Sequence, residues 1–197
     1  DSDNKGDKII LKGMGLGGWL VPEGYMLGTW GSPTSIRNRI TDLIGEDSTE
    51  VFYEKFEKNY VAEEDINQLA EWGFNSVRLP FHYKTLSPTY GSFNEKGFSV
   101  IDSVIAWCSR NEIYLILDMH VAPGSQSGDE NADGDEGAKL WDSPENQEWA
   151  VDIWGEIARR YATERWIGGY DLLNEPVLFN GGSQVRNLQR RMRNRIR

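Results

Sequence analysis

Four short aliphatic segments, each followed by a segment with helical periodicity, constrain the fold of this chain most. They lie in "KIILKGMG", "NSVRLPF", "IYLILDMH" and "GGYDLLNEP". Near-continuous aliphatic strands are buried on both faces, which is typical of a parallel sheet covered by helices. No linker composition and no internal repeat interrupts this order over the 197 residues. The sequence therefore predicts a single α/β domain spanning residues 1–197.

Helical periodicity predicts where the helices lie between these strands. One helix is expected to begin near Thr49, another near Ala62, and a third is expected over 97–110. The Ser-Pro pair at 143–144 has the N-cap and first-turn chemistry that begins a long helix. Residues 24–48 are rich in Gly, Pro, Ser and Thr with little periodicity. A long loop, with or without one helical turn, is expected there.

The single cysteine, Cys108, excludes an internal disulfide framework. Its spacing from Phe98, Ile101 and Ile105 places it on one face of the expected helix over 97–110. We therefore expect a buried thiol that packs in the core.

The net charge of −10 is unevenly distributed. Six arginines and no acid lie between Arg186 and Arg197, which leaves 15 basic residues against 31 acidic ones, a net charge of −16, before them. An acidic body argues against nucleic acid and anionic membranes as partners and favours a neutral polymer or small molecule. The sequence has no window of roughly 18 apolar residues, which is the length that a membrane span needs, so no span is predicted.

The arginine-rich end has two interpretations. It resembles a basic tail for nucleic acid. However, an apolar face at helical spacing runs along it, formed by Val185, Leu188, Met192 and Ile196. An amphipathic helix with a basic outer face is the favoured interpretation.

An acidic loop follows the third expected strand. Asp129, Asn131, Asp133 and Gly134 match the opening of a calcium-binding loop, but Leu140 stands where the bidentate acid is required. A solvated acidic loop is the favoured interpretation, and a calcium site at Asp129–Asp133 is the lesser alternative.

Polar or aromatic residues gather at the ends of the expected strands. The carboxyl ends of parallel strands meet at one edge of a sheet. This edge is where α/β barrels and open α/β sheets bind ligands. They are Trp19 and Glu23 after the first strand, Arg78 and His82 in and after the second, His120 at the end of the third, and Asn174 and Glu175 at the end of the fourth.

Asn174 and Glu175 are adjacent, so an ideal strand would point their side chains to opposite faces. Pro176 lacks the N–H that a strand ladder needs. We therefore expect the strand to end before this pair, which lets both side chains reach one mouth.

The segments "GLGGWLVPE", "VRLPF", "LDMHVAPGSQSG" and "LLNEP" together resemble glycoside hydrolase family 5, the retaining β-glycosidases built on the (β/α)8 TIM barrel. They occur in the family's order from about residue 10 to residue 176. The resemblance implies an α/β barrel, of which this chain holds about the first four β/α units. "GGWLVPE" and "HVAPGSQSG" are most similar to the exo-β-1,3-glucanase-like members.

The resemblance also implies roles for five residues. Glu175 matches the general acid/base and Asn174 its partner on the sugar 2-hydroxyl. Arg78 matches the arginine that supports the nucleophile, and His120 a histidine that lines the subsite of the sugar. Glu23 matches a glutamate that binds the terminal sugar in exo-acting members.

Flat aromatic rings suit the apolar faces of sugars, and Trp19, Trp30 and Trp141 lie in loops on the expected side of the sheet. Taken singly, each of these tryptophans is more often a core residue than a platform for a sugar. His82 is expected either to bind substrate or to hydrogen-bond within the barrel wall.

These residue types suit the chemistry, because a glycosidic oxygen is a poor leaving group that a carboxylic acid must protonate. A retaining mechanism needs a second carboxylate about 5 Å away, which the resemblance places at the end of the seventh strand. No glutamate here matches that motif, and the family does not use Asp118 in this way. We therefore expect the 197-residue chain alone to be inactive.

Two hypotheses follow. The first is the acid/base half of a secreted hydrolase that degrades β-glucans or related polysaccharides. The second is a catalytically silent half-barrel that binds glycan or assembles with a complementary chain, or with itself, through the open edges of its first and fourth strands. The sequence downstream of Arg197 discriminates between them.

No cofactor and no metal is expected to be required. The start, "DSDNKGDK", lacks a methionine and resembles a processed or trimmed end. An extracellular protein is therefore expected, with a periplasmic one as the alternative. The sugar, the linkage and exo or endo action are not set by these residues.

Overall fold

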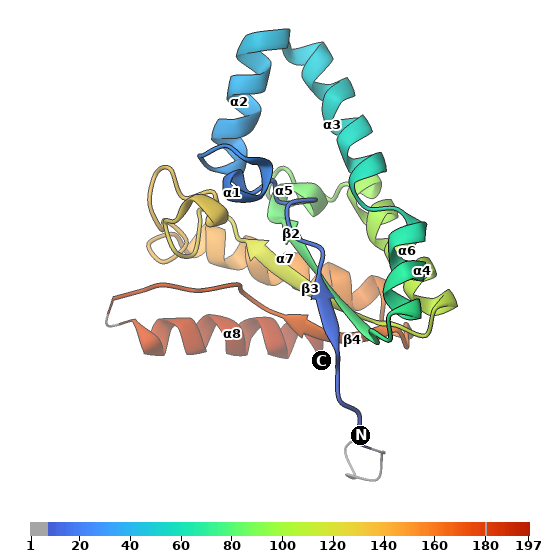
Figure 1. Cartoon of the computed structure of the whole chain (residues 1–197). Coiled ribbons are helices and arrows are strands. Elements are labelled where there is room, and N and C mark those ends of the chain that lie inside the picture. The colour runs from blue at the N-terminus through green and yellow to red at the C-terminus, as the bar shows by residue number, and fades with distance from the viewer. Residues whose placement is uncertain (1–7, 180) are drawn as a thin grey trace.

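The computed structural model describes residues 8–179 and 181–197 and is built around a parallel sheet (Figure 1). Its order follows the chain, β1-β2-β3-β4, and every neighbouring pair is parallel. The expected parallel α/β arrangement is confirmed. Within the described residues β1 and β4 form the edges of the sheet. The strands are β1 (Gly13–Gly15), β2 (Ser76–His82), β3 (Tyr114–Val121) and β4 (Ile167–Asp171).

The helices alternate with these strands, so that each parallel pair is joined by a crossover. Helices α2 and α3 project together away from the sheet, and α7 and α8 lie side by side along it (Figure 1). The helices are α1 (Gly24–Leu27), α2 (Pro33–Ile44), α3 (Glu46–Tyr60), α4 (Glu63–Glu71), α5 (Tyr83–Leu86), α6 (Glu95–Arg110), α7 (Pro144–Arg160) and α8 (Gly182–Ile196), with a 3-10 turn, η1, at Glu130–Ala132.

The core lies where the two central strands meet the helices. Apolar side chains of β2 and β3 are fully buried, as expected for strands covered on both faces. The face of α6 predicted from periodicity is buried against them, including Cys108. Burial raises the pKa of the Cys108 thiol to about 12, which fits the predicted structural role.

The loop expected over residues 24–48 is wrong, because this segment contains α1 and the twelve-residue helix α2. The Ser32 hydroxyl accepts a hydrogen bond from the backbone N–H of Ser35, 3.1 Å away, and Pro33 occupies the first turn. A Ser-Pro pair is a helix-start signal, the same one that correctly predicted α7.

The first and fourth strands differ in extent from the prediction. Residues 9–11, the aliphatic part of the first segment, are exposed, and β1 pairs with β2 only over Gly13–Gly15. The fourth strand ends at Asp171 because the chain leaves the ladder there. The carbonyl of Leu172 instead accepts a hydrogen bond from the Trp154 indole N–H at 3.0 Å.

The terminal helix α8 is amphipathic, as predicted. Leu188 and Met192 are buried against α7. Arg195 pairs with Asp152 of α7 at 3.1 Å, and Arg191 pairs with Glu148. No helix in the described part of the chain has the length and apolar character to cross a membrane.

Candidate active site

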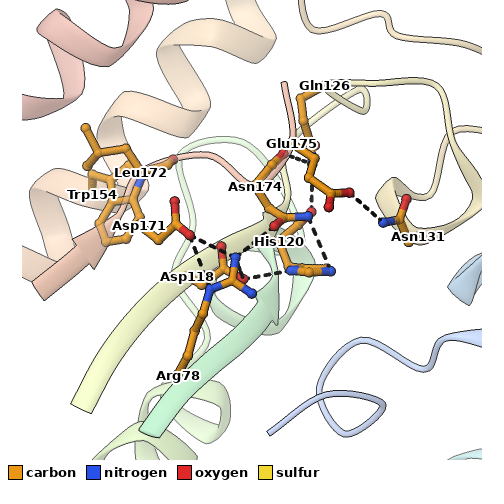
Figure 2. Close-up of polar contacts among 10 residues, drawn as sticks. All are labelled: Arg78, Asp118, His120, Gln126, Asn131, Trp154, Asp171, Leu172, Asn174 and Glu175. Carbon is orange, nitrogen blue, oxygen red and sulfur yellow. Dashed lines mark hydrogen bonds and ion pairs between the residues drawn. The ribbon is translucent and has the colours of Figure 1, made fainter. Parts of the chain in front are cut away.

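Arg78, on β2, is the centre of a polar network at the carboxyl end of the sheet (Figure 2). Its Nη2 lies 2.8 Å from Oδ2 of Asp171 and 2.9 Å from Oδ2 of Asp118. The same nitrogen donates to Oδ1 of Asn174 at 2.8 Å. Parallel pairing brings these groups together, because Arg78 on β2 lies opposite Ile116 on β3, and Asp118 lies opposite Asp171.

Asp118 and His120 lie two residues apart on β3, so both side chains point to the same face. Nδ1 of His120 lies 2.7 Å from Oδ2 of Asp118, which is fully buried. Burial raises the pKa of Asp118, against the opposing effects of the hydrogen bond from His120 and the charge of Arg78. Oδ1 of this carboxylate has no hydrogen-bond partner among the described residues.

Asn174 follows β4 and is held by both its backbone and its side chain. Its N–H donates to the carbonyl of Met119 at 3.1 Å, and its carbonyl accepts from Nε2 of Gln126 at 2.9 Å. Its side-chain Nδ2 lies 3.4 Å from Nε2 of His120. Gln126 is buried and also donates to the His120 carbonyl at 2.7 Å, so it braces the loop after β3 against the segment after β4.

Glu175 has a different environment from its neighbour. Its backbone has φ of 41°, in the left-handed region that side chains other than glycine rarely adopt. The exposed side chain points away from Arg78 toward the loop after β3, where Oε2 accepts from Nδ2 of Asn131 at 3.2 Å (Figure 2). The strand has ended four residues earlier, as expected, but the side chains of Asn174 and Glu175 have different partners.

Glu23 lies in the segment after β1 and is buried. The preceding residues join the sheet through a parallel bridge between Leu20 and Phe81. The charge of Glu23 is the main cause that raises the pKa of the exposed Tyr25, and the charge of Glu175 adds to it.

The acidic loop after β3 is tied to the N-terminus of α2. Asp133 accepts from the backbone N–H of Thr34 at 2.8 Å and from its hydroxyl at 2.6 Å. Ser32 donates to Asp135 at 2.6 Å, and the Gly31 N–H donates to Glu130 at 3.0 Å. Acids at a helix N-terminus satisfy free N–H groups and complement the helix dipole. These contacts account for much of the acidity of the loop.

His82, at the end of β2, also contacts the acidic loop through Asp133. Its Nδ1 accepts from the Lys84 N–H at 3.1 Å, so its Nε2 carries the hydrogen that faces Oδ2 of Asp133 at 3.1 Å. Burial lowers the pKa of His82, against the opposing effect of Asp133. Burial opposes ionisation of Asp133, but the hydrogen bonds from His82 and Thr34 outweigh it and lower its pKa. The predicted wall hydrogen bond of His82 is thus present.

The part of the chain that the structure describes contains no group of three or more His, Cys, Asp or Glu side chains placed to hold a metal ion. Asp133, one of the residues of the considered calcium loop, is already engaged by Thr34 and His82.

The three candidate tryptophans occupy different environments. Trp19 and Trp141 are buried, and their indole N–H groups donate to the carbonyls of Glu57 and Gln126 at 2.8 and 2.9 Å. Neither presents a ring face to solvent in this structure. Trp30 is 74% exposed, with the Arg39 guanidinium 5.5 Å from its ring centroid. A sugar-binding role for the three tryptophans stays a prediction.

Sequence reasoning missed four residues of the network, namely Asp118 and Asp171 as partners of Arg78, and Gln126 and Asn131 as braces. Asp118 carried a signal, because a charged residue within an aliphatic strand needs a partner on the same face. The pattern around Asn131 pointed only to a calcium-binding loop and did not indicate a contact with Glu175.

A family model described as Cellulase (glycosyl hydrolase family 5) matches residues 39–197. The chain belongs to glycosyl hydrolase family 5. The match covers β2, β3, β4 and the helices between them, so the family assignment and the site network rest on the same elements.

Relatives in the family have several glycosidase names. A protein named beta-xylosidase from Phanerodontia chrysosporium is 36% identical over 178 residues, which is 89% of this chain and 37% of the relative. A probable glucan 1,3-beta-glucosidase A from Aspergillus clavatus is 28% identical over 182 residues, 87% of this chain and 42% of the relative. The chain therefore spans about two fifths of the length of these curated relatives.

The crystal structure of rutinosidase from Aspergillus niger has the same fold, with a TM-score of 0.67 and 16% identity over 88% of this chain and 51% of that chain. Solved structures similar to this chain are glycoside hydrolase TIM barrels, and the four-stranded parallel sheet fits part of such a (β/α)8 barrel. The predicted family and fold class are confirmed.

Proposed function

We propose that this chain supplies the general acid/base and the glycone-binding wall of a retaining β-glycosidase that acts on β-glucans or related polysaccharides. Family membership supports hydrolysis of glycosidic bonds as the reaction class. The observation that carries the finer proposal is the network of Arg78, His120 and Asn174, with Glu175 as the next residue.

In this proposal Glu175 protonates the glycosidic oxygen and later takes a proton from the attacking water. Its solvent-exposed position, held by Asn131, leaves the carboxyl group accessible to a substrate. Asn174 has one amide hydrogen directed to His120 and a second one available for the sugar 2-hydroxyl.

Arg78 would keep the nucleophilic carboxylate ionised, because a nearby positive charge favours the charged form. Two carboxylates and one amide oxygen already orient its guanidinium. Glu23 would bind the far end of the sugar, which favours exo-action on a glucan terminus. The name of the Aspergillus clavatus relative supports a β-1,3-linked glucan as the first substrate to test.

The nucleophile is proposed to come from a complementary half of the barrel, in the same polypeptide or in a second chain. The open edges of β1 and β4 are the surfaces on which that half would close. The proposal includes export, because polymeric β-glucan lies outside the cell, and fractionation of the culture medium tests this.

The proposed role of Glu175 predicts a dependence on the leaving group. In the full-length protein, Glu175→Gln should lower kcat/KM by about 10²-fold or more on a β-glucan oligosaccharide. The loss should be much smaller on an aryl β-glucoside whose phenol leaves without protonation. Glu136→Gln, which alters an exposed acid of the neighbouring loop, is the matched control. Equal losses on both substrates would remove Glu175 from the role of acid.

The need for a complementary half is tested separately by assaying the 197-residue chain alone and together with the remainder of the barrel. Activity is expected only in the second case. Retaining turnover by the chain alone, abolished by Glu175→Gln, would contradict the proposal of a divided site. A full barrel that binds glucan without turnover would favour the silent alternative.

A further inference from the structure

A series of hydrogen bonds leads from Arg78 through Asn174 and His120 to Asp118. It has a single consistent direction, because Arg78 can only donate. Arg78 faces Asn174 at 2.8 Å, so the atom that faces it must be the amide oxygen. The amide nitrogen of Asn174 therefore faces Nε2 of His120, 3.4 Å away. Nε2 must accept, which means that the imidazole is neutral and carries its hydrogen on Nδ1.

That hydrogen has one acceptor, since Nδ1 of His120 lies 2.7 Å from Oδ2 of Asp118. The same oxygen lies 2.9 Å from Nη2 of Arg78, with which it forms an ion pair. An ionised carboxylate only accepts, so Oδ2 takes the hydrogen of Nδ1 while the charge of Arg78 lies beside it. The network thus begins at Arg78, passes through Asn174 and His120, and ends at the carboxylate that also binds Arg78.

We propose that Asp118 is a positioning residue of this site: its carboxylate holds His120 in the tautomer with hydrogen on Nδ1, and thereby orients the amide of Asn174 beside Glu175. The consequence for catalysis rests on the proposed function, whereas the tautomer does not. Without Asp118, no other residue that the structure describes is hydrogen-bonded to Nδ1, and the Nε2–H tautomer would face the amide hydrogens of Asn174.

Asp171 provides a matched comparison. Both carboxylates bind Nη2 of Arg78, at 2.8 Å for Asp171 and 2.9 Å for Asp118, but His120 is hydrogen-bonded to Asp118. Asp118 is fully buried, whereas the side chain of Asp171 is 40% exposed. Substitution of either aspartate therefore removes a carboxylate beside Arg78. Only substitution of Asp118 also removes the hydrogen-bond partner of Nδ1 of His120.

The experiment reads the tautomer directly. The full-length protein is labelled with ¹⁵N-histidine, and the signals of His82 and His120 are identified with His82→Gln and His120→Gln. His120 is expected in the Nδ1–H form in the native protein and in Asp171→Ala. Asp118→Ala, or Asp118→Leu if the smaller residue prevents folding, should shift it toward the Nε2–H form and lower kcat/KM by about 10²-fold.

Asp118→Asn should restore the native tautomer, because its amide oxygen can replace Oδ2, although its amide hydrogens are then buried without a partner. An Nε2–H tautomer in the native protein overturns the proposal, and so does an equal shift in Asp171→Ala or no shift in the Asp118 variants. If no variant at 118 folds, the native tautomer decides. Failure of the proposed function would leave the tautomer results intact and would show instead as unchanged turnover in Glu175→Gln.

Discussion

Asn131 and Glu175 are 44 residues apart in the chain, yet Nδ2 of one donates to Oε2 of the other at 3.2 Å. Asn131 lies on η1, between Glu130 and Asp133, which attach the loop to the start of α2. The side-chain position of the proposed acid therefore depends on a loop anchored to a distant helix.

Asp133→Ala should detach this loop. It removes two hydrogen bonds from Thr34 and one from His82, so we expect the free energy of unfolding to fall by about 1–3 kcal/mol. The kcat/KM of the full-length protein should fall as well, because Asn131 then no longer holds Glu175. Urea denaturation and the oligosaccharide assay measure these effects. Asp129→Ala, which alters an exposed acid whose side chain does not cap η1, should change neither.

His82 should make the protein less stable in mild acid. Burial lowers its folded-state pKa, so below the unfolded value of about 6.5 the unfolded chain binds the proton more readily than the native protein. Stability is thus present above that pH and is lost as the pH falls through this window. The lowered pKa of Asp133 acts in the same direction, but only below about 3.9.

The measurement is the free energy of unfolding at pH 7.5 and at pH 5. Native protein should lose more of it between these values than His82→Gln does. Taking the difference between the two proteins cancels the contributions of other groups, including the oppositely directed effect of the raised pKa of Asp118. Parallel curves for the two proteins would show that His82 does not titrate in this range.

The left-handed backbone conformation at Glu175 should lower the stability of the folded protein. With φ of 41°, a glycine at this position avoids the strain that any side chain with a Cβ experiences. Glu175→Gly should therefore be more stable than Glu175→Ala by about 1 kcal/mol, while both lose turnover. Thermal and urea unfolding compare the two variants. Equal stabilities would mean that the backbone relaxes in the variants.

Gly97 marks a close approach between α6 and the segment before it. A Cβ added there would lie 1.8 Å from the carbonyl oxygen of Thr85. Gly97→Ala should thus destabilise the protein by about 1–3 kcal/mol, although alanine is the better helix former. Gly169→Ala in β4 is the control, because its Cβ meets nothing within 4 Å. A stable Gly97→Ala protein would show that α6 can shift away from Thr85.

Local pattern predicted the elements with strong periodicity or caps, such as α6, α7 and the two central strands. It missed α2, where the start signal at Ser32 was present but outweighed by the loop-like composition. It also extended β4 past Asp171, because the indole of Trp154, which removes Leu172 from the ladder, comes from another helix. Contacts of this kind have no local sequence signature.

The sequence by itself determined the alternation of strands and helices, the family, and the set of polar residues at the strand ends, since all of these follow from periodicity and local motifs. Only the tertiary structure decided which of these residues meet. Parallel register set Asp118 opposite Asp171, and both carboxylates lie within 2.9 Å of Nη2 of Arg78. The left-handed turn at Glu175 directed its carboxylate to Asn131 rather than to His120. The physical reason is that hydrogen-bond partners distant in the chain are selected by packing and backbone geometry, which depend on all the elements at once.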